Sequence, residues 1–337
     1  MIGNAVLFAI GLVIAFQALR DVFDTVAVPG GSRARLKVVR RLVWLALPLW
    51  KRLRREGAVT TSFAPLVLVL SFVVWMTLLA VGFGLMTYAF RDAFKPPLLG
   101  LDDAIFLTGR SMVTLGFSET IATGFVRWIV LAGGFAGLGA MTLAITYLLE
   151  VQSGIGGRDA GIVKLNTAAG NPPSAVRLLE KSHDIGNTSR LPEVLRDARN
   201  WCATVRTSHT NRPSLIYFES IASGAGWPAA LGALIDVALL FEHVLDDLEL
   251  RGHALLLGQE ARQLARDLSG LVGLEPVPQE TSLEDAWAAV ELLRSAGYRV
   301  RGEPEVETLR TRRRVAHACV AAIAQHLGKP AAQLLPV

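Results

Sequence analysis

Residues 114–119 combine a hydroxyl side chain, a glycine and an acidic side chain in the order Thr-Leu-Gly-Phe-Ser-Glu. A segment of this composition can select ions, because a ring of backbone carbonyls can replace the hydration shell of a cation. Such a ring needs a hydroxyl group at its inner end and a glycine that lets the backbone turn its oxygens inward. Thr114 and Gly116 supply both. The predicted chemistry is coordination of a permeating monovalent cation, without a covalent step.

Two long apolar runs flank this segment and must position it. Residues 62–90 hold no charged side chain over 29 positions, and residues 128–149 hold none over 22. A helix needs roughly 20 apolar residues to cross a bilayer core, so both runs predict transmembrane helices with a re-entrant loop between them. Residues 2–19 form a third apolar run. It lacks the basic start of a signal peptide, so we expect a retained membrane helix.

The segment from Asp103 to Glu119 resembles the pore helix and TxGYGD filter of the potassium-channel superfamily, with Phe117 at the aromatic position and Glu119 at the acidic one. The resemblance covers roughly residues 62–149. It implies a selectivity filter that coordinates permeant K⁺, and neither a resident metal nor an organic cofactor. The filter residues would be Thr114, Leu115, Gly116, Phe117 and Ser118.

Ser118 replaces the second glycine of that filter pattern. A residue with a Cβ atom adopts the filter backbone at a cost of roughly 1–2 kcal/mol, so the alternative is a weakly selective Na⁺/K⁺ channel. Single-glycine filters also occur in the related Trk/Ktr-type potassium transporters. Those proteins carry four pore loops in one chain. The single loop here therefore predicts a homotetramer around one axis.

Other residues are expected to support the loop. Asp102 and Asp103 would cap a pore helix over about 103–113 and meet the positive end of its dipole. Arg110 is expected to pack behind the filter and pair with Glu119, because a buried charge needs a partner. The alternative for Arg110 is exposure at the outer mouth of the pore.

The second long run is expected to form the inner helix of the pore. By the same resemblance, Gly137 or Gly139 would serve as a gating hinge, although such glycines also serve close packing. Thr142 and Thr146 share a helix face and would line the cavity or bond back to their own helix. Glu150 would form a ring of carboxylates at the inner mouth, or a solvated helix end.

Basic residues predict the orientation. The loop from Arg20 to Thr61 holds ten Lys or Arg and three acidic residues, whereas the loop from Arg91 to Phe125 holds three and four. The first loop is therefore expected in the cytoplasm, with the N-terminus outside and everything after Glu150 inside a cell inner (plasma) membrane. Within that first loop, the apolar stretch Leu42–Trp50 lies between basic clusters. It predicts an interfacial helix on anionic membrane lipids.

The mean hydropathy of +0.41 hides two different halves. We expect an N-terminal segment over 1–61, a pore domain over 62–150, a linker over the glycine- and asparagine-rich residues 151–173, and a cytoplasmic all-α domain over 174–337. The apolar spacing of that domain predicts helices over 174–183, 191–208, 213–220, 227–250, 254–271, 282–296 and 305–327. The start of the fourth, Trp227–Phe241, holds Asp236 and is expected to be a buried core helix.

These features predict an all-α membrane protein: three transmembrane helices with a re-entrant pore helix and filter loop, plus a soluble helical domain. The expected function is a passive potassium-type cation channel, gated by an unknown stimulus through that domain. The domain would bind an unidentified cytoplasmic ligand or protein. The other class is a non-conducting membrane-anchored sensor or scaffold.

Several further functions are not indicated. No nucleophile–base pair or metal site stands out, so enzymatic activity is not expected. The net charge of +5 follows from the basic first loop and does not predict nucleic-acid binding. The six histidines are expected at the surface or at helix ends, and the two cysteines are expected to stay reduced.

Overall fold

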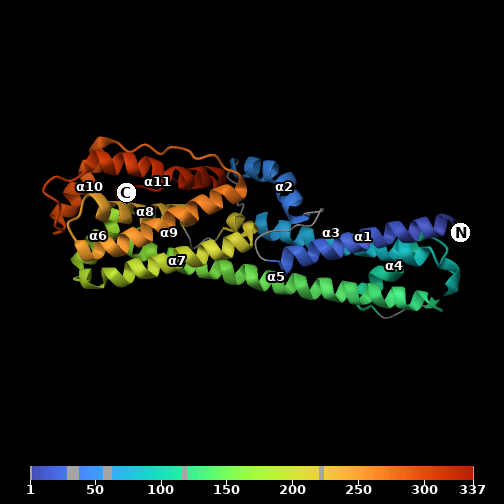
Figure 1. Ribbon diagram of the computed structural model, residues 1–337. Helices are drawn as coiled ribbons and strands as arrows, with labels where there is room; N and C mark the ends of the chain where they lie inside the picture. The colour runs from blue at the N-terminus through green and yellow to red at the C-terminus, as the bar shows by residue number, and fades with distance from the viewer. Residues whose placement is uncertain (1, 29–37, 56–62, 116–119, 220–223, 337) are drawn as a thin grey trace. The chain divides into compact units, whose positions relative to one another are not determined.

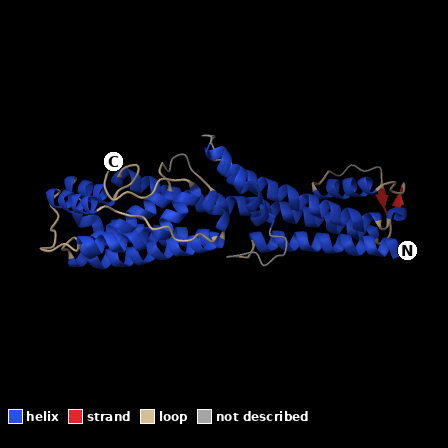
Figure 2. Cartoon of the chain, turned by 90° about the horizontal axis from the view of Figure 1, so that it is seen from above, coloured by secondary structure: helices blue, strands red, loops and turns tan. Residues whose placement is uncertain are grey.

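The computed structural model describes residues 2–28, 38–55, 63–115, 120–219 and 224–336 (Figure 1). The chain folds into two compact units, which we call the N-terminal unit (Met1–Val151) and the C-terminal unit (Gln152–Val337). The described residues are largely helical. Figure 2 shows the sheet they contain as one short pair of strands.

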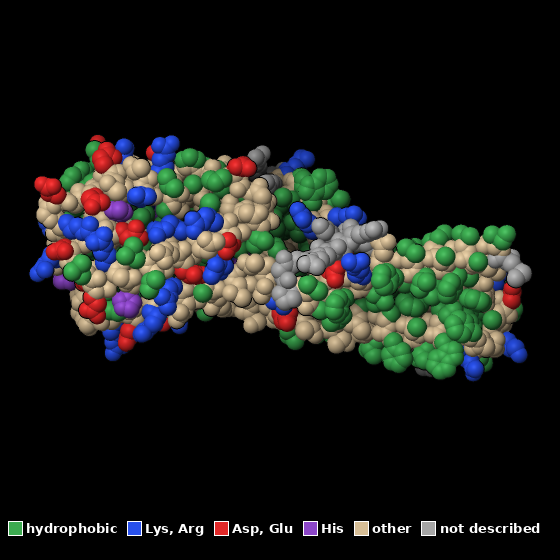
Figure 3. Space-filling model, in the orientation of Figure 1, with side chains coloured by type: hydrophobic (Ala, Val, Ile, Leu, Met, Phe, Trp, Pro, Cys, Tyr) green, Lys and Arg blue, Asp and Glu red, His purple; other side chains and the backbone are tan. Residues whose placement is uncertain are grey.

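The N-terminal unit contains three helices that are long and apolar enough to cross a membrane, as the sequence predicts. They are α1 (Ile2–Val26), α3 (Phe63–Tyr88) and α5 (Val126–Ala169), of which α5 ends in the C-terminal unit. Along the chain, α2 (Val38–Arg55) follows α1 and α4 (Leu101–Met112) follows α3. Hydrophobic side chains gather on the visible face of the N-terminal unit in Figure 3, whereas charged side chains are spread over the C-terminal unit.

Helices α1 and α3 pack against each other in antiparallel directions at small residues. A Cβ atom on Gly11 would lie 2.5 Å from the backbone oxygen of Gly82, and one on Gly82 would lie 2.8 Å from the nitrogen of Ala15. Near one end of the pair, the rings of Phe8 and Phe90 meet edge to face. Small residues let two apolar helices approach closely, which is how helix pairs associate where lipid removes the hydrophobic driving force.

At the other end of this pair, α1 carries a fully buried acidic side chain, Asp21. Its Oδ2 atom accepts a hydrogen bond of 2.8 Å from the indole Nε1 of Trp75 on α3 and one of 3.2 Å from the backbone nitrogen of Val38, where α2 begins. A buried carboxylate is costly unless it is hydrogen-bonded. Asp21 therefore ties α1, α3 and the start of α2 together.

The C-terminal unit is a helical bundle. Its helices after α5 are α6 (Ala175–Asp184), α7 (Leu191–Asn211), α8 (Trp227–His243), α9 (Leu248–Val272), α10 (Leu283–Ser295) and α11 (Val306–Leu327). Two 3₁₀ turns, η2 (Thr188–Arg190) and η3 (Pro213–Tyr217), precede and follow α7. Four of the predicted helices agree with these within a few residues, whereas the helix expected over 213–220 is the 3₁₀ turn η3 over its first five residues. Two further segments differ from expectation.

The first is the segment 151–173, expected as a linker, which is helical as far as Ala169. Its glycines are spaced within an otherwise helix-compatible sequence and do not break the helix. The second is the expected single helix over 227–250, which ends at His243. The side chain of Asp247 accepts a hydrogen bond of 2.9 Å from the nitrogen of Leu250 and so starts α9 as an N-cap.

Helix α8 is the centre of the C-terminal unit, and every residue from Trp227 to Phe241 is buried. The prediction of a core helix is confirmed. Asp236 lies on it, and its carboxylate accepts hydrogen bonds from Arg313 (2.8 and 3.0 Å) and pairs with the Nε2 of His317 at 2.7 Å. Burial alone would raise the pKa of Asp236, but Arg313 and His317 together hold that pKa below its usual value.

A second buried charge joins α5 to the loop after α7. The guanidinium of Arg158 is almost fully buried and donates hydrogen bonds to the backbone oxygens of Leu215 (3.2 Å) and Phe218 (2.9 Å). It also lies 3.0 Å from the carboxylate of Asp159 and 3.5 Å from the Nε2 of His209. His209 and His317 are both fully buried, so the expectation of a surface position is wrong for both, although His209 lies in the last turn of α7. His209 lies beside Arg158 of α5, and His317 pairs with Asp236 of α8, which the spacing of these residues in the sequence does not reveal.

The ion pair between Asp236 of α8 and Arg313 of α11 predicts different stability effects for substitutions at two neighbouring arginines. In Arg313→Met, Asp236 keeps its buried charge without its main partner, so the free energy of unfolding should fall by about 3–5 kcal/mol. Arg314 pairs with Glu280 at 3.0 Å with both side chains more than half exposed, so Arg314→Met should change stability by less than about 1 kcal/mol. Thermal unfolding of the full chain in detergent measures both. Equal shifts in the two variants would contradict this account.

His209 predicts a pH dependence. Burial, and to a smaller extent the charge of Arg158, lowers the pKa of His209 to about 3. The unfolded chain binds a proton at this histidine below about pH 6.5, and the folded chain does not until near pH 3. Stability is therefore complete above about pH 6.5 and falls by about 1.4 kcal/mol per pH unit below it. The variant His209→Gln should reduce the slope of unfolding free energy against pH by that amount. His183→Gln, at an exposed position, should not.

Candidate functional site

The candidate site is built around α4, which begins at a cap formed by Asp103. The Asp103 carboxylate accepts hydrogen bonds from the backbone nitrogens of Leu99 (3.2 Å) and Gly100 (3.1 Å). These nitrogens lack partners within the helix, and a carboxylate there also meets the positive end of the helix dipole. The helix starts at Leu101 and ends at Met112, close to the predicted range of 103–113.

One side of α4 is held by α3. The hydroxyl of Thr108 donates to the backbone oxygen of Ala80 on α3 at 3.2 Å. A Cβ atom on Gly84 would lie 2.6 Å from the side chain of Ile105. Because Gly84 lies opposite Ile105 and Ala80 opposite Thr108, α4 runs antiparallel to α3. Its C-terminal end therefore points toward the middle of α3.

The other side of α4 is held by α5. A Cβ atom on Gly137 would overlap Met112, including its Cα atom at 2.7 Å, and one on Gly134 would lie 3.1 Å from the hydroxyl of Ser111. Ser111 also reaches the backbone oxygen of Val130 at 3.5 Å. Gly137 lies at the middle of the apolar run 128–149. The end of α4 is thus buried halfway along the apolar part of α5.

The chain leaves α4 through a residue in an unusual conformation. Thr114 has φ 61°, the left-handed region, which is disfavoured for a β-branched residue. The turn is held by a hydrogen bond of 3.2 Å from the nitrogen of Thr114 to Ser111 O and one of 3.0 Å from the nitrogen of Leu115 to Arg110 O. Strained backbone of this kind gathers at functional sites. Thr114 and Leu115 are exposed, and Gly116, Phe117, Ser118 and Glu119 lie outside the described residues.

The two ends of the loop that contains α4 are joined. Strand β1 (Phe94–Lys95) pairs with β2 (Ile121–Ala122) in antiparallel register, with Phe94 opposite Ala122. Next to this pair, both the nitrogen (2.9 Å) and the hydroxyl (2.6 Å) of Thr123 donate to the backbone oxygen of Ala93. The 3₁₀ turn η1 (Arg91–Ala93) connects α3 to β1. The chain therefore enters and leaves the loop at one place.

Arg110 is half-buried on α4, and its guanidinium lies over the ring of Phe106, 5.5 Å from the ring centre. This cation–π contact accommodates the charge without placing it in the core. The expected partner, Glu119, lies outside the described residues, so their pairing stays a prediction.

The remaining predicted residues lie along α5. Gly137 is buried in a packing contact, whereas Gly139 has open space around its Cα atom. The hydroxyl of Thr142 donates to Leu138 O at 2.9 Å and that of Thr146 to Thr142 O at 3.0 Å, so both bond back to their own helix. Both threonines are exposed in the single chain. Glu150 is exposed too, and α5 continues past it to Ala169.

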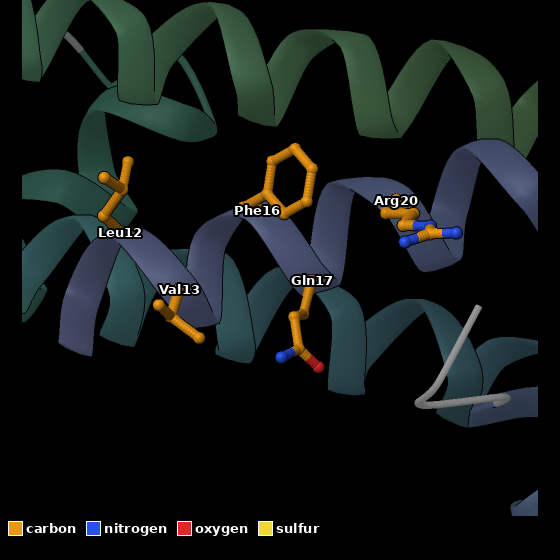
Figure 4. Close-up of a pocket in the computed structure, with 5 residues that line it drawn as sticks. All are labelled: Leu12, Val13, Phe16, Gln17 and Arg20. Carbon is orange, nitrogen blue, oxygen red and sulfur yellow. The ribbon is translucent and has the colours of Figure 1, made fainter. Parts of the chain in front are cut away.

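The single chain also leaves wide apolar surfaces without cover. Figure 4 shows five residues of α1 that line an open groove of about 470 Å³: Leu12, Val13, Phe16, Gln17 and Arg20. Val13 and Gln17 point to one side of the helix and Phe16 to the other. On α5, Phe135 and Ile145 are more than half exposed. Surfaces of this kind suit lipid or other chains rather than water.

Sequence reasoning missed two contributors to this unit. One is Asp21, which an acidic residue next to an apolar run could have revealed, because ionisable residues in membrane segments are rare and specific in role. The other is the pair of glycines on α3, Gly82 and Gly84, whose spacing resembles the small-residue contacts of packed helices. Among the described residues, no group of His, Cys, Asp and Glu could hold a metal ion.

Comparisons with known proteins do not identify this chain: no family model, no curated protein and no solved structure matches it. The inference about function therefore depends on the residues and geometry described above.

The contact between α4 and α5 predicts different effects for two nearby glycines. Gly137→Ala places a methyl group against the backbone of Met112, so α4 must shift, at a cost of about 1–3 kcal/mol. Gly139→Ala adds a methyl group where there is space, and alanine favours the helix by about 1 kcal/mol. Thermal unfolding in detergent should therefore show a lower midpoint for Gly137→Ala and an unchanged or higher one for Gly139→Ala. The reverse order would contradict the described packing.

Proposed function

We propose that this protein is a passive potassium-type cation channel in which four copies of the chain surround one pore. Each copy would contribute the loop that contains α4, with carbonyls of Thr114, Leu115, Gly116 and Phe117 facing the axis. The orientation follows from the basic residues: N-terminus and filter loop outside, C-terminal unit in the cytoplasm.

The observation that carries this proposal is the path of the loop between α3 and α5. Pairing of β1 with β2 brings its two ends together, while α4 runs between them, buried on α3 and α5, as far as Gly137. A re-entrant filter needs a loop whose helix reaches halfway along two membrane helices and whose two ends meet on one side. Irregular backbone at this depth is tolerated only where protein or a water-filled cavity surrounds it.

The lengths agree with such a path. The twelve residues of α4 extend about 18 Å at 1.5 Å per residue, a little over half of a bilayer core about 30 Å thick. The eight residues from Val113 to Thr120 provide up to about 26 Å of chain, which is enough for the return. The predicted filter residues, 114–118, fall within these eight residues of the sequence.

Electrostatics support the same arrangement. The C-terminal end of α4 carries the negative end of the helix dipole, and it lies deep within the unit, at Met112. Asp103 neutralises the positive end near the loop's entrance. In a tetramer, four such negative ends would surround the axis below the filter and stabilise a dehydrated cation.

A tetramer would also cover part of the exposed apolar surface, with lipid covering the rest.

Helix α5 continues from the apolar run into the C-terminal unit, so a ligand or protein that binds there could act on the pore through one helix. The stimulus itself is unidentified. The non-conducting sensor or scaffold is the alternative that fits a folded C-terminal unit without a functional filter.

The test is the reversal potential of purified protein in planar bilayers with opposed K⁺ and Na⁺ gradients. We expect unitary currents that reverse near the potassium limit and disappear in Gly116→Ala. Gly252→Ala, at an exposed glycine of α9 with open space around it, is the matched control and should conduct normally. Reversal near zero would instead establish the weakly selective Na⁺/K⁺ channel.

Two results would contradict the proposal. Currents that survive in Gly116→Ala would mean that the filter lies elsewhere. Absence of current in the wild type under all conditions, with correct folding and tetramer formation, would favour the sensor or scaffold. The size of the assembly in detergent, measured by light scattering, tests the tetramer separately.

A further inference from the structure

Helix α2 has an outer face that a water-exposed helix would not carry. Trp44, Leu45 and Leu49 are 74%, 70% and 61% exposed, and they lie within two turns of each other. Its opposite face is used for packing: Val38 and Trp50 are buried, and the Trp50 ring stacks on that of Phe63 with centres 5.1 Å apart. The helix therefore carries large apolar side chains on its exposed side as well as on its packed side.

The same helix is strongly basic. It carries six Lys or Arg residues and no acidic residue: Arg40, Arg41, Lys51, Arg52, Arg54 and Arg55. An outer face of large apolar side chains on a helix with one sign of charge is typical of helices that lie in the headgroup layer of an anionic bilayer. A tryptophan suits that layer because its ring is apolar and its N–H is polar.

The position of α2 in the N-terminal unit fits a membrane surface. Its first residue is bonded to Asp21 near the end of α1, and Trp50 near its end stacks on Phe63, the first residue of α3. Because α1 and α3 are antiparallel, the end of α1 and the start of α3 lie on the same side. Helix α2 is thus anchored at both ends at one boundary of two candidate membrane helices, where headgroups begin.

We infer that α2 is a binding surface for anionic phospholipid, with Trp44, Leu45 and Leu49 inserted among the lipid chains and described basic residues such as Arg40 at the headgroups. This inference does not depend on the proposed channel activity. It requires only that α1 and α3 cross a membrane.

The test uses quenching of tryptophan fluorescence by brominated lipids, with the full chain reconstituted in vesicles. Wild type and Trp44→Phe are compared in brominated phosphatidylcholine with and without brominated phosphatidylglycerol. The difference between the two proteins is the signal of Trp44. We expect quenching of this signal, with a higher relative association constant for the anionic lipid. Trp287→Phe, an exposed tryptophan of α10, is the control and should remove no quenched component.

The charge contribution is tested with Arg40→Gln, at an exposed position of α2. One basic residue near an anionic surface changes binding by about fivefold, so the preference of Trp44 for the anionic lipid should fall by about that factor. Arg312→Gln, at an exposed position of α11, should leave it unchanged. A Trp44 signal that no brominated lipid quenches would overturn the inference and indicate that protein covers α2. Equal quenching by both lipids would also overturn it, since no anionic preference would exist.

Discussion

Close backbone contact at small residues is the interaction on which the N-terminal unit depends. Helices with apolar residues on every side gain little from burying them against each other in lipid, so packing distance decides which pairs associate. Gly11 and Gly82 bring α1 and α3 together, Gly84 admits Ile105 of α4, and Gly137 admits Met112. The last two contacts determine how deeply α4 is buried. The strained turn at Thr114 follows at that depth, so the candidate site is a consequence of glycine positions on two other helices.

The C-terminal unit is organised by a different constraint. Its central helix α8 is buried over its first fifteen residues, as a core helix in water should be, yet it contains the charge of Asp236. That charge is tolerated because Arg313, His317 and, through Arg313, Thr281 surround it with hydrogen bonds. A buried ionic network gives little net stability but is costly to break. It therefore specifies how α8 and α11 pair rather than how strongly the unit is held together.

The sequence predicts elements far better than contacts. Charge-free runs and helical spacing identify α1, α3, the first half of α5 and most helices of the C-terminal unit, because these depend on local hydrophobicity and capping. Residues 151–169, expected as a linker because of their glycines, are helical, since a glycine weakens a helix without ending it. Buried His209 and Asp21 were not recognised either, since their partners Arg158 and Trp75 are about fifty residues away. Within the site, the capped helix and its limits were predictable, whereas the contact of Gly137 with Met112 required the fold.

Helix α5 has residues in both units and contains no proline. Its apolar half packs against α4, and its second half carries Arg158 and packs Gly161 against Trp201. Between them lie Gly154, Gly156 and Gly157, and each glycine destabilises a helix by about 1 kcal/mol relative to alanine. The last two have no neighbouring atoms that would restore this loss. These glycines lower the intrinsic helix propensity of α5 just beyond Glu150. Under the proposed function, a gating movement carried along α5 would cross this stretch, so its stiffness would limit how much of that movement reaches the pore.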